Sequence, residues 1–168
     1  NNAFRTCGLS ANDYMETTTS FAASMLSSVG GDTAKAAELS NNALIAMSDN
    51  ANKMGTNMQD IQNAYQGFAK QNYTMLDNLK LGYGGTKEEM QRLLSDANKL
   101  NKQQGIITDY SIDSFADITE AIQVVQDNLG ITGTTALEAA STLSGSFGTM
   151  QAAWTNFIAK LSVGNQDQ

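Results

Sequence analysis

The 168-residue sequence has no histidine, no proline and a single cysteine, and each lack excludes a class of structure or chemistry. Without histidine the chain can form no histidine-based zinc site, Ser–His–Asp triad or Cys–His pair of its own. Cys7 has no second cysteine for an intrachain disulfide and no histidine as a general base. We therefore interpret it as a structural thiol.

Charge is also scarce, since Asp, Glu, Lys and Arg make up 16% of the residues, against about 25% in an average globular protein. The net charge of −7 repels phosphate backbones and anionic lipid surfaces, so no nucleic-acid binding is expected. No apolar run approaches the roughly 18 residues of a transmembrane helix. The chain opens without methionine or a signal sequence, and we expect it to be an internal segment of a longer protein.

The residues that are present favour helices. Hydrophobic residues form 41% of the chain, enough to bury a core. The 14 glycines fall mostly in clusters, and apolar residues recur at spacings of three and four, with no strand pattern. The sequence therefore predicts an all-α fold, a bundle of about six to eight short helices separated by glycine-rich turns. We expect one helical domain over residues 1–168, with a subdivision near 82–86 or 104–111 left open.

Four helices are expected in the first half. One starts at the cap Ser10 and ends at Gly30-Gly31, and the next runs from the cap Asp32 to Met54-Gly55. Thr56 with Gln59 suggests a capping box for a third helix. Its apolar stripe would comprise Met58, Ile61, Tyr65 and Phe68. A short helix between 72 and 81 would hold Met75, Leu76 and Leu79.

The second half begins with the clearest helix start in the chain. After Gly82-Tyr83-Gly84-Gly85, the residues Thr86 and Glu89 form a capping box, and that helix closes at Gly105. Ser111 or Ser114 opens the next helix. Its stripe comprises Phe115, Ile118, Ile122, Val125 and Leu129, which we interpret as core packing because it is too short for a coiled coil. Further helices are expected after Thr135 and around Met150, Trp154, Phe157 and Leu161.

Each candidate catalytic or ligand-binding motif departs from the pattern that its chemistry requires, or has a simpler structural interpretation. Asp113, Asp117 and Glu120 lie on the polar side of the stripe, and we interpret them as a solvated acidic face. The 82–87 segment departs from a phosphate loop because Thr86 precedes Lys87 and no buried strand leads into it. Ser146 lacks the first glycine of a nucleophile elbow, and Trp154 is expected to be a core or interface anchor. We predict no enzymatic activity, with no catalytic, cofactor-binding or metal-binding residues.

Several blocks of the sequence, in order, resemble a known family. They are 47–56, 79–97, 114–126, and a last block with Gly130 to Thr135, Glu138-Ala139, Gly145-Ser146 and Ala152 to Trp154. Together they resemble the tail tape-measure proteins of bacteriophages and prophages. The resemblance covers nearly the whole chain.

This resemblance implies a structural and assembly role in determining tail length, with release from the tail when DNA is ejected. It implies a location in the lumen of the virion tail tube, and in the host cytoplasm during assembly. The implied partners are tail-tube proteins and tail-tip or assembly-chaperone proteins, with a homo-oligomer left open. Two alternatives remain: a domain associated with a cell-wall hydrolase, and a helical interaction module of a phage-like contractile particle or secretion apparatus.

Overall fold

The computed structural model describes residues 21–131, and this part of the chain is helical. Residues 21–28 are helical, and they are followed by α3 (Thr33–Met54), α4 (Met58–Ala69), the 3-10 helix η1 (Leu76–Leu79), α5 (Lys87–Gln103) and α6 (Phe115–Asn128). Helices account for 69% of the described residues, which contain no strand. Over this range the fold is all-helical, and none of its helices is both long and apolar enough to cross a membrane.

Three of the predicted helix starts are confirmed by hydrogen bonds to side chains. Asp32 accepts from the backbone N–H of Lys35 at 3.0 Å, and Thr86 accepts from that of Glu89 at 3.1 Å. Of the two serines considered for α6, Ser114 is the cap, and it accepts from the Asp117 N–H at 3.2 Å. These bonds satisfy donors that the first helical turn leaves without a partner.

The predicted capping box at the start of α4 is wrong. Asn57 is the cap, because its side-chain oxygen accepts from the N–H groups of both Gln59 and Asp60. Thr56 instead donates its hydroxyl hydrogen to the side chain of the buried Asn50, at 2.8 Å. The Asn57 side chain accepts from two N–H groups that have no partner within the helix, whereas the Thr56 hydroxyl is already bonded to Asn50.

Two other predictions need correction. The helix expected between 72 and 81 is only the four-residue η1, in which Leu76 and Leu79 are buried while Met75 precedes it and is exposed. Leu129 does not continue the buried stripe of α6, because the helix ends at Asn128 and Leu129 is its exposed C-cap. The predicted start at Ser10 and the helices expected after residue 133 lie outside the described residues.

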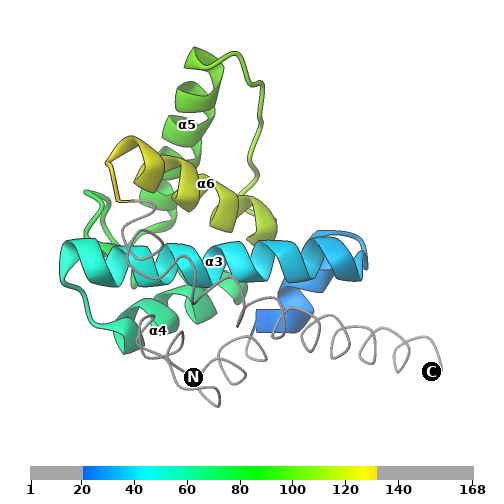
Figure 1. Cartoon of the computed structure of the whole chain (residues 1–168), viewed down its shortest axis with the longest axis horizontal. Helices are drawn as coiled ribbons and strands as arrows, with labels where there is room; N and C mark the ends of the chain where they lie inside the picture. Colours follow the sequence, from blue (N-terminus) through cyan, green and yellow to red (C-terminus); the bar gives the residue numbers. More distant parts are fainter. Residues whose placement is uncertain (1–20, 132–168) are drawn as a thin grey trace, which may run out of the picture.

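The helix α3 crosses the middle of the described part and packs against α6 and α4 (Figure 1). Its neighbour α6 runs in the same direction, since Phe115 at the start of α6 lies near the early turns of α3 and Gln126 bonds to Ala46 and Asn50. The helix α4 packs against both α3 and α6, and α5 packs chiefly on α6. Figure 1 shows α5 extending away from α3 and α4, with the segment after it running back to α6.

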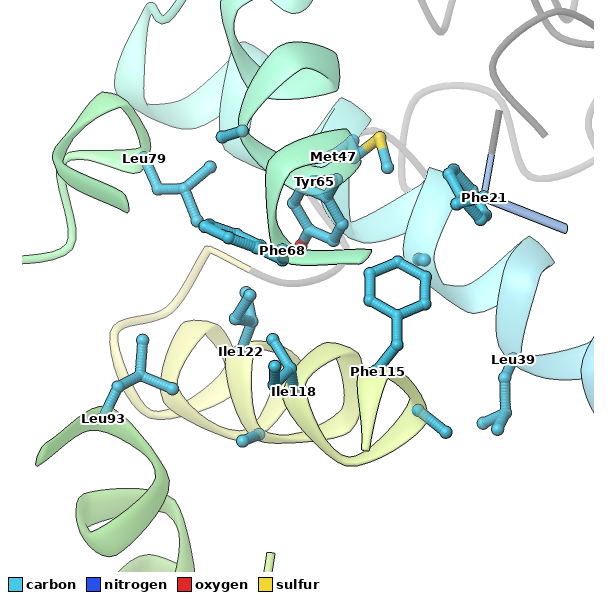
Figure 2. Packing of buried hydrophobic residues seen from close by; sticks show 14 of the residues in the cluster. Phe21, Leu39, Met47, Tyr65, Phe68, Leu79, Leu93, Phe115, Ile118 and Ile122 are labelled. Atoms are coloured by element: carbon cyan, nitrogen blue, oxygen red, sulfur yellow. The ribbon is translucent and has the colours of Figure 1, made fainter. Parts of the chain in front are cut away.

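The buried apolar residues form one cluster to which all these elements contribute (Figure 2). Aromatic rings fill its centre: Phe21 lies 5.5 Å from Phe115 between ring centroids, and Tyr65 lies 5.6 Å from Phe68. The predicted stripes of α4 and α6 face this cluster through Ile61, Tyr65, Phe68, Phe115, Ile118, Ile122 and Val125. The alternating stripe of α6 is therefore core packing, as predicted.

Candidate functional site

The turn between η1 and α5 is the strongest candidate in the sequence for binding an anion, and its geometry opposes that role. The backbone N–H of Gly84, which would face a bound phosphate, donates to the Glu89 carboxylate at 3.0 Å. A helix N-terminus attracts negative charge. Here the negative charge is supplied by the helix itself, and the side chain of Glu89 fills the position that an anion would take.

Arg92 closes this turn from the next helical turn. Its guanidinium donates to both carboxylate oxygens of Glu89, at 2.7 and 3.0 Å, and to the Gly82 carbonyl at 2.8 Å. It also lies over the ring of Tyr83, 4.2 Å from the ring centroid. The Tyr83 hydroxyl in turn donates to the Asp96 carboxylate at 2.6 Å. One arginine therefore ties a backbone carbonyl, a carboxylate and an aromatic face together.

The charges of this cluster stabilise one another. The hydrogen bonds from Arg92 and from the Gly84 N–H lower the pKa of Glu89 to about 2. Burial and the hydrogen bond to Asp96 raise the pKa of Tyr83, so its hydroxyl stays protonated. The Glu89 carboxylate raises the pKa of Arg92. Each of these groups is committed to a neighbour, so the turn has the properties of a rigid helix start.

The acidic residues in α6 and just before it do not share one environment. Asp113 is exposed, as the solvated-face interpretation predicts, and so is Asp127, whereas Asp117 and Glu120 are half-buried. Asp117 accepts from the Ser111 N–H at 2.9 Å and so helps to shape the turn before α6. Burial raises the pKa of Glu120, which lies in an open hollow with Lys35, Glu38 and Tyr110.

No motif in the sequence predicts the buried amide cluster, which we define as Asn50, Gln126 and Thr56. The Asn50 side-chain amide donates to the Leu79 carbonyl and to the Gln126 side-chain oxygen, both at 2.9 Å. Gln126 donates to the Ala46 carbonyl at 3.1 Å, and Thr56 supplies the bond to the Asn50 oxygen. Asn50 and Gln126 are both fully buried. The buried amide cluster joins α3, η1 and α6 at one point.

The hollows of the described part are open and modest in size. One hollow between α5 and α6 has a volume of about 350 Å³ and is lined mainly by Asn, Gln and Asp side chains with Leu100 and Val124. Within residues 21–131, no three His, Cys, Asp or Glu side chains gather closely enough to hold a metal ion. Cys7, Ser146 and Trp154 lie outside the described residues.

Comparisons with protein-family models, with curated proteins and with solved structures find no match to this chain.

Proposed function

We propose that this chain is a non-catalytic, helical segment of a bacteriophage or prophage tail tape-measure protein. The observation that carries the proposal is the resemblance of ordered sequence blocks to that family, above all the block from Leu79 to Ala97. Hydrogen bonds in the structure give several residues of that block a structural role at the start of α5. Gly82, Tyr83, Gly84, Glu89, Arg92 and Asp96 bond to one another.

The proposed role is assembly of the tail and determination of its length, followed by release when DNA is ejected. The proposed site is the tail-tube lumen, reached from the host cytoplasm during assembly, with tail-tube and tail-tip or assembly-chaperone proteins as partners. Over the full 168 residues we infer a bundle of six to eight helices with glycine-rich turns. Backbone chemical shifts of the whole chain would count those helices.

We assign the measuring itself to other parts of the full-length protein. As one continuous helix, 168 residues would span about 250 Å, whereas a packed domain of this length has a radius of gyration near 15 Å. In the described part, the positive φ angles of Gly30 and Gly31 turn the chain sharply before α3. We therefore propose that this segment is folded and that a separate, extended part of the full-length protein determines the tail length.

The test uses a phage or prophage whose tail gene contains this segment. An in-frame deletion within the long helical region of that gene should shorten the tails, measured by negative-stain electron microscopy. Deletion of this segment should instead abolish tail assembly or leave the measured length unchanged. Tails shortened in proportion to its 168 residues would assign the measuring to this segment and overturn that part of the proposal.

A second test separates the structural role from hydrolysis of the cell wall. The purified 168-residue chain is incubated with peptidoglycan, and soluble muropeptides are measured. We expect no release above buffer, while a muramidase as positive control digests the same preparation. Release by this chain would defeat the non-catalytic proposal.

A further inference from the structure

The turn before α5 is hydrogen-bonded to α5 itself. The Arg92 guanidinium donates to the Gly82 carbonyl at 2.8 Å, and the Tyr83 hydroxyl donates to the Asp96 carboxylate at 2.6 Å. Arg92 and Asp96 both belong to α5. The side chains of the helix therefore hold the turn that precedes it.

The segment that returns from α5 toward α6 is held in the same way. The side-chain oxygen of Asn98 accepts from the Thr108 hydroxyl at 2.8 Å and from the Tyr110 N–H at 3.1 Å. The Asn101 amide donates to the hydroxyl oxygens of Thr108 and Tyr110, at 3.1 and 3.2 Å. Four hydrogen bonds therefore fasten the returning segment to α5.

The partners of the backbone change between η1 and the turn before α5. The Leu79 carbonyl accepts from Asn50 of α3, whereas the Gly82 carbonyl accepts from Arg92 of α5. Lys80, which lies between them, has a φ of 55°, and Gly82 has a φ of 95°. The chain therefore turns sharply between a residue that is bonded to α3 and a residue that is bonded to α5.

A second change of partner lies at the other end of the returning segment. The Tyr110 N–H donates to Asn98 of α5, whereas the N–H of the next residue, Ser111, donates to the Asp117 carboxylate of α6. We call residues 82–110 the α5 unit. Within residues 21–131, no hydrogen bond or ion pair joins the α5 unit to residues outside it.

Apolar contact attaches the α5 unit to the rest of the fold. The helix α5 packs chiefly on α6, and Figure 2 shows Leu93 pointing from α5 toward α6. At the base of the unit, the backbone of Gly85 lies close to the Thr74 carbonyl. Apolar contact has little directional preference. The apolar residues that α5 buries are Met90, Leu93, Leu94 and Ala97.

The contact of α6 with α3 is different, because it contains directional bonds as well as apolar packing. Asn50 donates to the Gln126 side chain at 2.9 Å, and Gln126 donates to the Ala46 carbonyl at 3.1 Å. Phe115 of α6 packs against Phe21. All of these residues lie outside the α5 unit. Detaching the α5 unit therefore leaves the bonds between α3 and α6 in place.

We propose that the α5 unit is a separate cooperative unit, which detaches from α6 and unfolds while α3, α4 and α6 stay packed. The helix α5 has 17 residues, and an isolated helix of about this length is only marginally stable in water. Once detached, α5 therefore unfolds together with the two segments that are bonded to it. The chain then has a second, partly open state, in which α6 is uncovered on one side. The argument uses only these contacts and does not depend on the proposed function.

The first experiment measures native-state hydrogen exchange of the full 168-residue chain in low concentrations of urea. The slowest amides of α5 should exchange at least about tenfold faster than the slowest amides of α3 and α6. They should also share one dependence on urea. Because opening of the unit exposes only part of the surface that global unfolding exposes, that dependence should be above zero and weaker than the one for α3 and α6.

The second experiment compares one change outside the unit with one inside it. Asn50→Leu breaks bonds that are intact in both the closed and the partly open state, so it should speed exchange in α3 and α6 and leave α5 within about twofold. Leu93→Ala weakens the contact that opening breaks, and it should speed exchange in α5 by at least about tenfold. Thr56→Ala, which loses the bond to Asn50, is the milder replacement for Asn50→Leu if that variant does not fold.

Three results would overturn the proposal. The first is a common slowest rate for α5, α3 and α6, which means that the chain unfolds as one unit. The second is an acceleration of α5 by Asn50→Leu or Thr56→Ala as large as that of α3. The third is exchange in α5 that does not depend on urea, which means that single hydrogen bonds open one at a time.

Discussion

The helix α3 meets α6 in two chemically different ways along its length. Near its start the contact is apolar, with Phe115 packed between Phe21 and the early turns of α3 (Figure 2). Near its end the contact is the buried amide cluster. Apolar packing has little directional preference, whereas hydrogen bonds between buried amides require one alignment. We infer that the first contact contributes most of the stability and the second fixes how far α6 slides along α3.

The largest effect is expected at the apolar contact. Phe115→Ala removes a buried ring and should lower the free energy of unfolding by about 3–5 kcal/mol, measured by urea denaturation. Leu129→Ala, in the exposed C-cap of the same helix, should change it by no more than about 0.5 kcal/mol. Equal effects would show that the apolar contact is not the main source of stability.

In the buried amide cluster, loss of both amides should cost less stability than the sum of the two single losses. Asn50→Leu removes the donor to the Gln126 side-chain oxygen and to the Leu79 carbonyl, at a cost of about 1–3 kcal/mol for each buried group left unbonded. Adding Gln126→Leu should recover about 0.5–3 kcal/mol relative to the sum of the single changes. Asn63→Ala, which breaks an exposed bond to Gln59, is the control and should have little effect. If the cost of the double change equalled the sum of the single costs, the two side chains would contribute to stability independently.

The turn before α5 follows Leu79, whose carbonyl accepts from Asn50 near the end of α3. A Cβ atom at Gly85 would overlap the carbonyl oxygen of Thr74, which as backbone cannot move aside easily. Gly85→Ala should therefore cost about 1–3 kcal/mol. At Gly84 the new Cβ would lie 3.6 Å from the Glu89 side chain, an ordinary contact. Gly84→Ala is thus the matched control in thermal unfolding, and a cost as large as that of Gly85→Ala would contradict the steric explanation.

The smallest expected effect, that of Tyr65→Phe, is an increase in stability. The hydroxyl of Tyr65 is fully buried among apolar side chains and has no hydrogen-bond partner in the described structure. Burial alone raises its pKa. Tyr65→Phe should raise the free energy of unfolding by about 1 kcal/mol, whereas Tyr83→Phe, which loses the bond to Asp96, should lower it by a similar amount. Destabilisation by Tyr65→Phe would reveal a partner for that hydroxyl.

Local signals in the sequence were enough to place most of the helices. Asp32, Thr86 and Ser114 cap helices because a short polar side chain at that position can reach the free N–H groups of the first turn. The apolar stripe of α6 was predictable because spacing alone determines which residues share a face. The turn before α5 was also predictable as a helix start, because Thr86 at the cap position can accept from the Glu89 N–H.

Long-range polar contacts were not predictable. Asn50 and Gln126 belong to a chain rich in Asn and Gln, and no local pattern distinguishes a buried amide from a solvated one. The same contact misled the prediction for α4, since Thr56 bonds to Asn50 and leaves the cap to Asn57. Leu129 was misplaced because the stripe continues in the sequence after the helix has ended.

The buried amide cluster also has a consequence for synthesis on the ribosome. Asn50 and Gln126 are 76 residues apart. At a translation rate of 5–20 residues per second, Gln126 of α6 is therefore synthesised roughly 4–15 s after Asn50 of α3. During that interval the face that α6 will cover is open to water. Near the end of α3 this face carries Asn50, which is buried in the finished fold. Its polar side chain makes the uncovered face less apolar, and we infer that it protects the nascent chain from aggregation until α6 has been synthesised.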